Sequence, residues 1–225
     1  MILESYYWRK ILLKTSEKLK KRIKVTEPWT PKKFAKFEKE IMFGFYIIRK
    51  LIEANKLTNK LVSTKKECKV HKNLGTKITI RNRHSFYEYY DFENYSIRKS
   101  DLKFLNNQFV HSYIFSPIIS TVDDYSLKLM ENEKLSDEEL CEIYENSEKE
   151  VTGIYFNSDK NKDKSIFQID ITTVIDIFRD AGDCNVTSIS MKYNEKKDDW
   201  DSFQSDDNIE ISKETMELIN KLEEE

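Results

Sequence analysis

The amino-acid sequence predicts an α+β protein, in which a helical bundle with an inserted β-hairpin is followed by a small antiparallel sheet with one helix. Gly and Pro are scarce, with 4 and 3 among 225 residues, and 35% of the residues are charged. This composition favours helices with long polar faces over a fold rich in tight turns. Apolar residues recur at helical spacing near the start of the chain, whereas the final third has short apolar segments typical of strands.

A chain of this length can fold as one compact unit, and within it we expect three parts. Residues 1–115 form a basic helical bundle with the β-hairpin inserted at about 65–83. Residues 116–200 form an acidic sheet-and-helix portion packed on the bundle, and residues 201–225 form an acidic tail with a terminal helix.

The net charge of -2 hides a division of charge along the chain. Residues 1–84 contain 23 Lys and Arg against 7 Asp and Glu, whereas residues 85–225 contain 15 against 33. A basic first third can hold phosphates, and an acidic remainder can fold against it or meet a basic partner. Solvated helix faces are the alternative explanation for both excesses.

Two amphipathic helices are expected at the start of the chain. Residues 4–24 place apolar side chains at three- and four-residue steps, and lysine and arginine cover most of the remaining surface. This basic helix could lie on nucleic acid, with Lys21 and Arg22 as contacts, or on anionic lipid, but a bundle helix with a solvated face has the same pattern. Thr30 and Pro31 then provide an N-cap and a first-turn proline for the second helix.

The second helix runs to about Lys56 and is apolar around most of its second half. Gly44 weakens a helix by ~1 kcal/mol relative to alanine, so we expect it to admit another helix at close approach. Arg49 and Lys50 interrupt the apolar run from Phe45 to Leu51. Ionisable groups inside a core stripe are costly unless they have partners, which makes this segment a candidate site.

Residues 65–83 change to an alternating pattern around a turn-forming Asn and Gly, which predicts a small basic hairpin. Arg81 and Arg83 are its candidate nucleic-acid contacts, and an aromatic cluster follows from Phe86 to Tyr95. Rings that stack on bases and cations that hold phosphates suit single-stranded nucleic acid. The acidic residues within this cluster favour structural aromatics instead.

The elements after residue 100 follow from capping signals and short apolar runs. Ser100 and Asp101 cap a helix, and Ser136-Asp-Glu-Glu139 matches a capping box. In order, we expect a helix to about residue 112, a strand over 114–122, a short helix from Ser136, strands over 151–156 and 165–169 paired antiparallel, a helix over 172–181, a strand over 186–193 and a terminal helix over 212–222.

The helix before residue 112 carries polar residues in an apolar run, and Asn107 and His111 lie one turn apart on one face. A histidine can act as base or acid towards a ribose 2′-hydroxyl. If this helix packs beside the second helix, Arg49 or Lys50 supplies a cation for phosphate. The structural alternatives are a core histidine bonded to a backbone carbonyl or to Asn107, and an Arg49 that pairs with Glu53.

This arrangement resembles the HEPN superfamily of helical-bundle proteins, many of which are metal-independent ribonucleases in bacterial defence and toxin systems. In that family a helix carries Arg, often followed by Asn, and then His after a short spacer. Asn106 stands here at the place of the arginine, with four residues between it and His111. The resemblance covers residues 1–115 and implies an endoribonuclease or a non-catalytic relative. It implies His111 as general base, with Asn107 and Arg49 orienting or neutralising phosphate.

Several other classes of site are not indicated. The three cysteines stand far apart without a CxxC pair, and four glycines provide no phosphate-binding loop, so we expect neither metal nor cofactor. Residues 159–163 resemble the opening of a calcium loop, but Lys164 replaces the required glycine, which favours a polar hairpin loop. The longest apolar run, 41–48, is too short for a bilayer and the start lacks a signal pattern, so we expect a cytoplasmic protein.

The sequence therefore indicates an RNA- or nucleic-acid-associated bacterial or phage protein of the defence or toxin type. The first alternative is a protein-interaction module without catalysis, which assembles with a partner or a second copy through its charge-segregated surfaces. A DNA-binding regulator that uses the basic first helix is a third class. The predicted nucleic-acid contacts are Lys50, Arg81, Arg83, Lys21 and Arg22.

Overall fold

The computed structural model describes residues 4–131 and 135–206 and confirms the α+β class. The helices begin where capping residues were predicted: the side chains of Thr30 and Asp101 accept backbone N–H groups, and Ser136 with Glu139 forms a capping box. The helices are α1 Ser5–Arg22, α2 Pro31–Glu53, α3 Asn59–Ser63, α4 Leu102–Val110, α5 Asp124–Met130, α6 Asp137–Asn146 and α7 Ile171–Asp183, with a 3-10 helix η1 at Arg83–Glu88.

The strands form one large antiparallel sheet and a separate hairpin. In the large sheet the order is β4, β5, β6, β2 and β3, and β1 pairs with the first residues of β5. The strands are β1 Lys24–Val25, β2 Lys66–Asn73, β3 Tyr90–Ser100, β4 Ser112–Thr121, β5 Lys149–Ser158, β6 Ser165–Asp170, β7 Ser188–Asn194 and β8 Asp199–Ser205.

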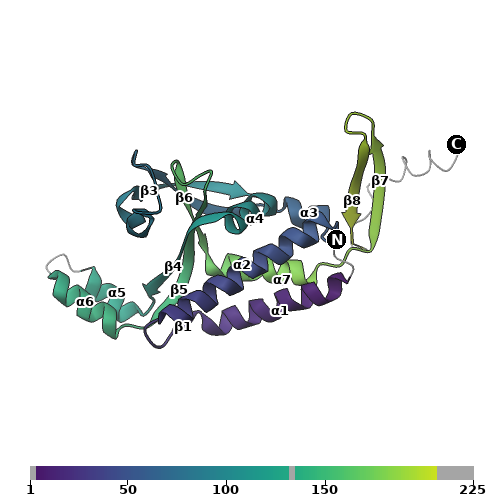
Figure 1. The fold of residues 1–225 in the computed structure, drawn as a ribbon. Coiled ribbons are helices and arrows are strands. Elements are labelled where there is room, and N and C mark those ends of the chain that lie inside the picture. The colour runs from purple at the N-terminus through teal and green to yellow at the C-terminus, as the bar shows by residue number, and fades with distance from the viewer. Residues whose placement is uncertain (1–3, 132–134, 207–225) are drawn as a thin grey trace, which may run out of the picture.

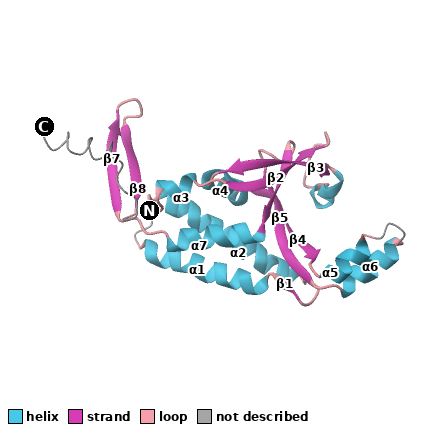
Figure 2. Ribbon diagram, turned by 180° about the vertical axis from the view of Figure 1, so that it is seen from behind, coloured by secondary structure: helices cyan, strands magenta, loops and turns pink. Residues whose placement is uncertain are grey.

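The long helices α1, α2 and α7 lie side by side beneath the sheet, and β5 and β6 pack on α7 (Figure 1). Seen from behind, the β7–β8 hairpin and the α5–α6 pair stand at opposite ends of the molecule (Figure 2). Because β2 and β3 pair into one sheet with β5 and β6, strands from residues 1–115 and 116–200 belong to one sheet, and Cys68 of β2 lies in the same buried cluster as Ile154 of β5.

The prediction of a hairpin at about 65–83 is wrong for the second strand, because the described residues between β2 and β3 include no strand. β2 begins as expected, but it pairs with β3 on one edge and with β6 on the other. The backbone N–H of Ile78 donates to Asp163 Oδ1 at 2.7 Å, and the Asn82 side chain binds backbone groups of the same segment. These bonds replace the inter-strand hydrogen bonds that the alternating pattern predicted, and the residues around Ile78 and Asn82 fold as turns.

Helix packing explains the glycine in α2. A Cβ atom built on Gly44 would lie 2.2 Å from Cζ of Phe178, so the α7 ring occupies the space that a side chain would need. This confirms the predicted close approach of another helix. On the neighbouring face of α2, Phe45 stacks on Phe109 of α4 at 4.0 Å between ring centroids, and Phe109 stacks on Phe156 of β5 at 4.2 Å. The ring stack fixes α4 beside α2.

The acidic end of the chain differs from prediction in one respect. The expected strand over 186–193 is β7, but the start of the expected acidic tail is not irregular, because residues 199–205 form the partner strand β8. The loop at residues 159–163 joins β5 to β6 as the predicted polar hairpin loop. The terminal helix expected over 212–222 lies outside the described residues.

Candidate functional site

Arg49 and His111 meet on the surface where α2 packs beside α4. Nη1 of Arg49 lies 3.1 Å from Nε2 of His111, although 62 positions separate the two residues in the sequence. His111 is the residue directly after α4, and its backbone N–H donates to the carbonyl of Asn107 at 3.2 Å. The end of α4 therefore holds the ring at the helix boundary, exposed to solvent.

The chemistry of the contact assigns the ring's hydrogen. A guanidinium group has only N–H donors, so Nε2 of His111 must be the acceptor and a neutral ring carries its proton on Nδ1. In this tautomer Nε2 has a free lone pair, as a general base requires. The guanidinium is a cation beside that lone pair, and it can bind a phosphate in bidentate fashion.

Glu53 pairs with both cations of this segment. Its carboxylate accepts from Nε of Arg49 at 2.8 Å and from Nζ of Lys50 at 2.7 Å. The bonds from Lys50 and then Arg49 lower the pKa of Glu53, and the same carboxylate raises the pKa of Lys50. The salt bridge between Arg49 and Glu53, expected as the structural alternative, exists together with the His111 contact.

The polar residues of α4 divide between surface and interior. The Asn107 side chain is exposed and makes no hydrogen bond within the described residues, so only its backbone joins it to His111. Asn106 is 3% exposed, and its Oδ1 has no hydrogen-bond partner within that part of the chain. Gln108 is buried, and its Oε1 accepts from the Ser158 N–H at 3.1 Å and from Nδ2 of Asn161 at 3.0 Å.

Gln108 thus anchors α4 to the loop between β5 and β6, a role that the sequence analysis missed. The apolar residues Phe104 and Leu105, one helical turn before this glutamine, and Phe109 after it were the only signal for a buried position. The partner of a buried amide 50 positions away cannot be read from local spacing.

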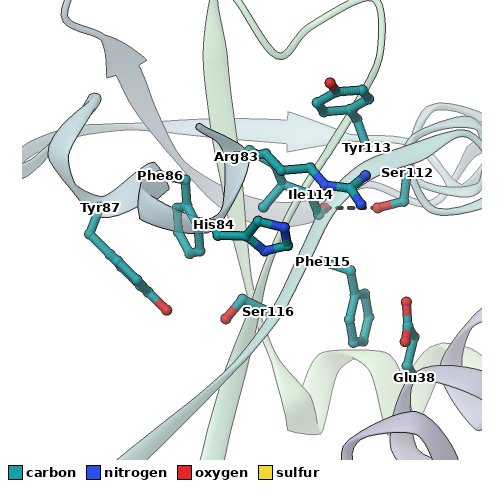
Figure 3. Close-up of a pocket in the computed structure, with 10 residues that line it drawn as sticks. All are labelled: Glu38, Arg83, His84, Phe86, Tyr87, Ser112, Tyr113, Ile114, Phe115 and Ser116. Atoms are coloured by element: carbon teal, nitrogen blue, oxygen red, sulfur yellow. Dashed lines mark hydrogen bonds between the residues drawn. The ribbon is translucent and has the colours of Figure 1, made fainter. Parts of the chain in front are cut away.

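Arg83 lies at a second candidate surface, a hollow of about 410 Å³ between η1 and the start of β4 (Figure 3). The guanidinium lies 5.7 Å from the centre of the Tyr113 ring, and His84 points into the hollow beside it. Glu38 of α2 and the Ser112 hydroxyl, which donates to a backbone carbonyl, also line the space. Arg81 is exposed in the preceding turns and is not part of this hollow.

Lys21 and Arg22 line a third surface, a hollow of about 350 Å³ between the end of α1 and the start of α2. Arg22 donates to Glu40 at 2.5 Å, whereas Lys21 has no ion pair among the described residues. Sequence reasoning missed that Trp29 and Lys36 line the same hollow, because the fold of the connection between the helices brings them there. The predicted site residues thus lie in four separate places. Arg49, Lys50, Asn107 and His111 gather where α2 meets α4, Lys21 and Arg22 share the hollow between α1 and α2, and Arg83 and Arg81 lie apart from both.

Comparison of the chain with protein-family models, curated proteins and solved structures finds no match. The resemblance to the HEPN superfamily therefore stays a prediction. Within residues 4–131 and 135–206, no helix has the length and apolar character needed to span a bilayer, and no three potential metal-ligating side chains gather into a cluster.

Proposed function

We propose that this protein is an RNA-associated protein of the defence or toxin type, and that it contacts a phosphodiester at the Arg49–His111 pair. The observation that carries the proposal is the 3.1 Å contact between Nη1 of Arg49 and Nε2 of His111 on an exposed surface. A donor-only cation beside an unprotonated imidazole nitrogen is the combination needed to hold a phosphate and to accept a hydroxyl proton.

In the proposed reaction the phosphate of RNA competes with His111 for the Arg49 guanidinium. A charge-assisted, bidentate bond to phosphate is stronger than the bond to a neutral imidazole, so Arg49 turns to the phosphate and frees Nε2. Lys50, on the next position of α2, adds a second positive charge, and the exposed Asn107 amide can orient a phosphate oxygen.

The freed Nε2 then acts as general base. It takes the proton of the ribose 2′-hydroxyl while the 2′ oxygen bonds to phosphorus and the bond from phosphorus to the 5′ oxygen breaks. Solvent protonates the leaving 5′ oxygen, and His111 returns its proton to solvent. The products are a 2′,3′-cyclic phosphate and a 5′-hydroxyl end, and the step requires no metal ion.

The test is incubation of the purified full-length protein with a labelled single-stranded RNA, with and without a chelator. We expect cleavage that the chelator does not change and that His111→Ala and Arg49→Ala each abolish. His84→Ala is the matched control, because His84 is also exposed but lines the hollow beside Arg83. Absence of cleavage by the unmodified protein refutes the catalytic step, and absence of RNA binding in the same samples refutes the function itself.

An exposed apolar row on the β7–β8 hairpin favours the second candidate, an interaction module. Cross-strand pairing places Tyr193 opposite Trp200 on one face, and Ile189 and Met191 alternate onto the same face. These four side chains are 44%, 56%, 51% and 60% exposed, respectively. A row of this kind marks a surface for a protein partner, and a second copy of the chain is the simplest one.

Sedimentation equilibrium over a range of concentrations tests this candidate. Self-association that Met191→Lys abolishes supports a dimer through the hairpin, with Lys192→Gln on the opposite face as the control. A monomer at all concentrations contradicts it. If the protein is an interaction module, His111→Ala should lower the melting temperature without removing any activity.

A further inference from the structure

The outer face of α2 carries three lysines, then two aromatic side chains, then a further lysine along its length. At helical spacing, residues three and four positions apart fall on one stripe, which here faces away from the core. All of its members are exposed or half-buried, and α1 and α7 pack on the other side of the helix. We call this stripe the α2 ridge; it consists of Lys32, Lys36, Lys39, Phe43, Tyr46 and Lys50.

The two aromatic rings at the centre of the α2 ridge lie parallel and open to solvent. Phe43 and Tyr46 are 44% and 41% exposed, and their rings stack at an interplanar angle of 12° with centroids 6.3 Å apart. Nζ of Lys50 lies 5.8 Å from the centre of the Tyr46 ring. A single exposed ring on a helix needs no explanation, but a stacked pair flanked by lysines is a surface on which further rings can stack.

The charge on the α2 ridge is uncompensated over its first half. Lys32, Lys36 and Lys39 have no ion pair among the described residues. Of the three acids of this helix, Glu40 bonds to Arg22 and Glu38 lines the hollow beside Arg83, whereas Glu53 bonds to Lys50 at the end of the ridge. The ridge is therefore complementary in charge to a polyanion rather than to a neutral partner.

The α2 ridge also connects two surfaces. Lys36, near its start, lines the hollow between α1 and α2 together with Lys21 and Trp29. Lys50, at its end, shares the Glu53 carboxylate with Arg49, which contacts His111. The distance from the start to the end of the ridge is roughly 27 Å at the rise of an α-helix.

We propose that the α2 ridge is a binding track for single-stranded RNA, with phosphates on Lys36 and Lys39 and bases stacked on Phe43 and Tyr46. This rests on the proposed function, because a strand lying on the ridge leads its backbone to Arg49 and His111. Bases in a duplex are already stacked and paired, so the ridge selects single strands over duplexes.

Fluorescence anisotropy with the full-length protein and a labelled oligouridine tests the track. We expect Phe43→Ala with Tyr46→Ala to weaken binding roughly tenfold or more, since stacking one base on a ring contributes strongly. Phe43→Leu with Tyr46→Leu keeps an apolar surface without rings and should weaken binding as well. Lys36→Gln with Lys39→Gln should make the slope of log K against log salt shallower by about 1.4, at ~0.7 for each phosphate that is no longer neutralised.

Matched controls lie on the distant hairpin. Tyr193→Ala with Trp200→Ala removes an exposed ring pair whose centroids are 5.4 Å apart, and Lys192→Gln with Lys196→Gln removes two positive charges, as many as the ridge variant does. Both should leave RNA binding unchanged, and melting temperatures establish that every variant is folded. A duplex of the same length should bind more weakly than the single strand.

The outcomes separate the track from the proposed function. If the unmodified protein binds RNA and the ridge variants bind as tightly, while Arg49→Ala weakens binding, the track is wrong and the function stands. If the unmodified protein binds neither single strands nor duplexes, both are wrong. If it binds no RNA but binds phosphatidylserine vesicles through Lys36 and Lys39, the ridge is a membrane surface and the proposal is overturned.

Discussion

The Arg49 guanidinium reaches across the contact between α2 and α4 to the ring of His111, and the bond it makes assigns the position of the imidazole proton. Nη1 can only donate, so Nε2 at 3.1 Å accepts and the neutral ring is protonated at Nδ1. Arg49→Ala removes the only side-chain partner of this nitrogen among the described residues. We predict that the neutral ring then shifts towards the Nε2-protonated form.

Long-range proton–nitrogen correlation spectra of the imidazole rings measure this shift. The buried His71 is an internal control, because its Nδ1 faces the Asp91 carbonyl at 3.1 Å and its tautomer does not depend on Arg49. If the His111 tautomer is unchanged in Arg49→Ala, the hydrogen bond from Arg49 to His111 is not formed in solution. The proposal that Arg49 keeps Nε2 of His111 unprotonated for use as a general base would then be wrong.

The contact between Gly44 and Phe178 leads to a stability prediction. In an isolated helix Gly44→Ala should stabilise by ~1 kcal/mol. Here the new Cβ would lie 2.2 Å from Cζ of Phe178, and overpacking of this kind costs about 1–3 kcal/mol. We therefore predict that Gly44→Ala lowers the free energy of unfolding, measured by urea denaturation.

A double-mutant cycle provides the control for Gly44. In a Phe178→Leu background the smaller side chain leaves room near Gly44, so Gly44→Ala should cost less there than in the unmodified protein. A Gly44→Ala variant that is more stable than the unmodified protein would contradict the packing of α7 against α2.

The cysteines should differ sharply in reactivity. Burial raises the pKa of the Cys68 thiol to about 12, so at neutral pH almost none of it is thiolate, the reactive form. Cys141 is exposed on α6. We predict that iodoacetamide labels Cys141 rapidly and Cys68 only when the sheet opens, as followed by mass spectrometry of peptides.

Denaturant supplies the control for this labelling. In urea above the unfolding midpoint both thiols should react at similar rates, since burial no longer raises the pKa of Cys68. Equal labelling rates under native conditions would mean that β2 does not bury Cys68 behind the helix layer.

Helix boundaries could be predicted from the sequence because the residues that fix them are close together in the chain. Thr30 and Asp101 each bond a backbone N–H three positions on, a relationship that spacing alone reveals. The partner of β2 could not be predicted in this way. Alternation in residues 65–83 is compatible with a local hairpin, but β3 and β6 occupy the two edges of β2.

The candidate site was predictable to the same limited degree. Arg49 and His111 both follow apolar runs, and the stacking of Phe45 on Phe109 brings those runs together. The sequence placed Asn107 on the same face as His111, but it did not show that the Asn107 side chain faces solvent. Membership of a face is a local property, whereas the partner of a side chain depends on tertiary packing.

The last prediction concerns Asp101, which caps the helix that ends at His111. Its carboxylate accepts the Phe104 N–H at 2.8 Å and a hydrogen bond from Lys65 Nζ at 3.2 Å, and these bonds hold the pKa of Asp101 below its usual range. Since the folded pKa is depressed, the stabilisation is present above the unfolded pKa and is lost as the pH falls through the folded pKa. Asp101→Ala should cost about 0.5–2 kcal/mol at pH 7, measured by urea unfolding, and less at pH 3. Asp101→Asn keeps a capping oxygen and should cost less than alanine at pH 7. An alanine cost that is the same at both pH values would mean that the ionised carboxylate does not stabilise α4.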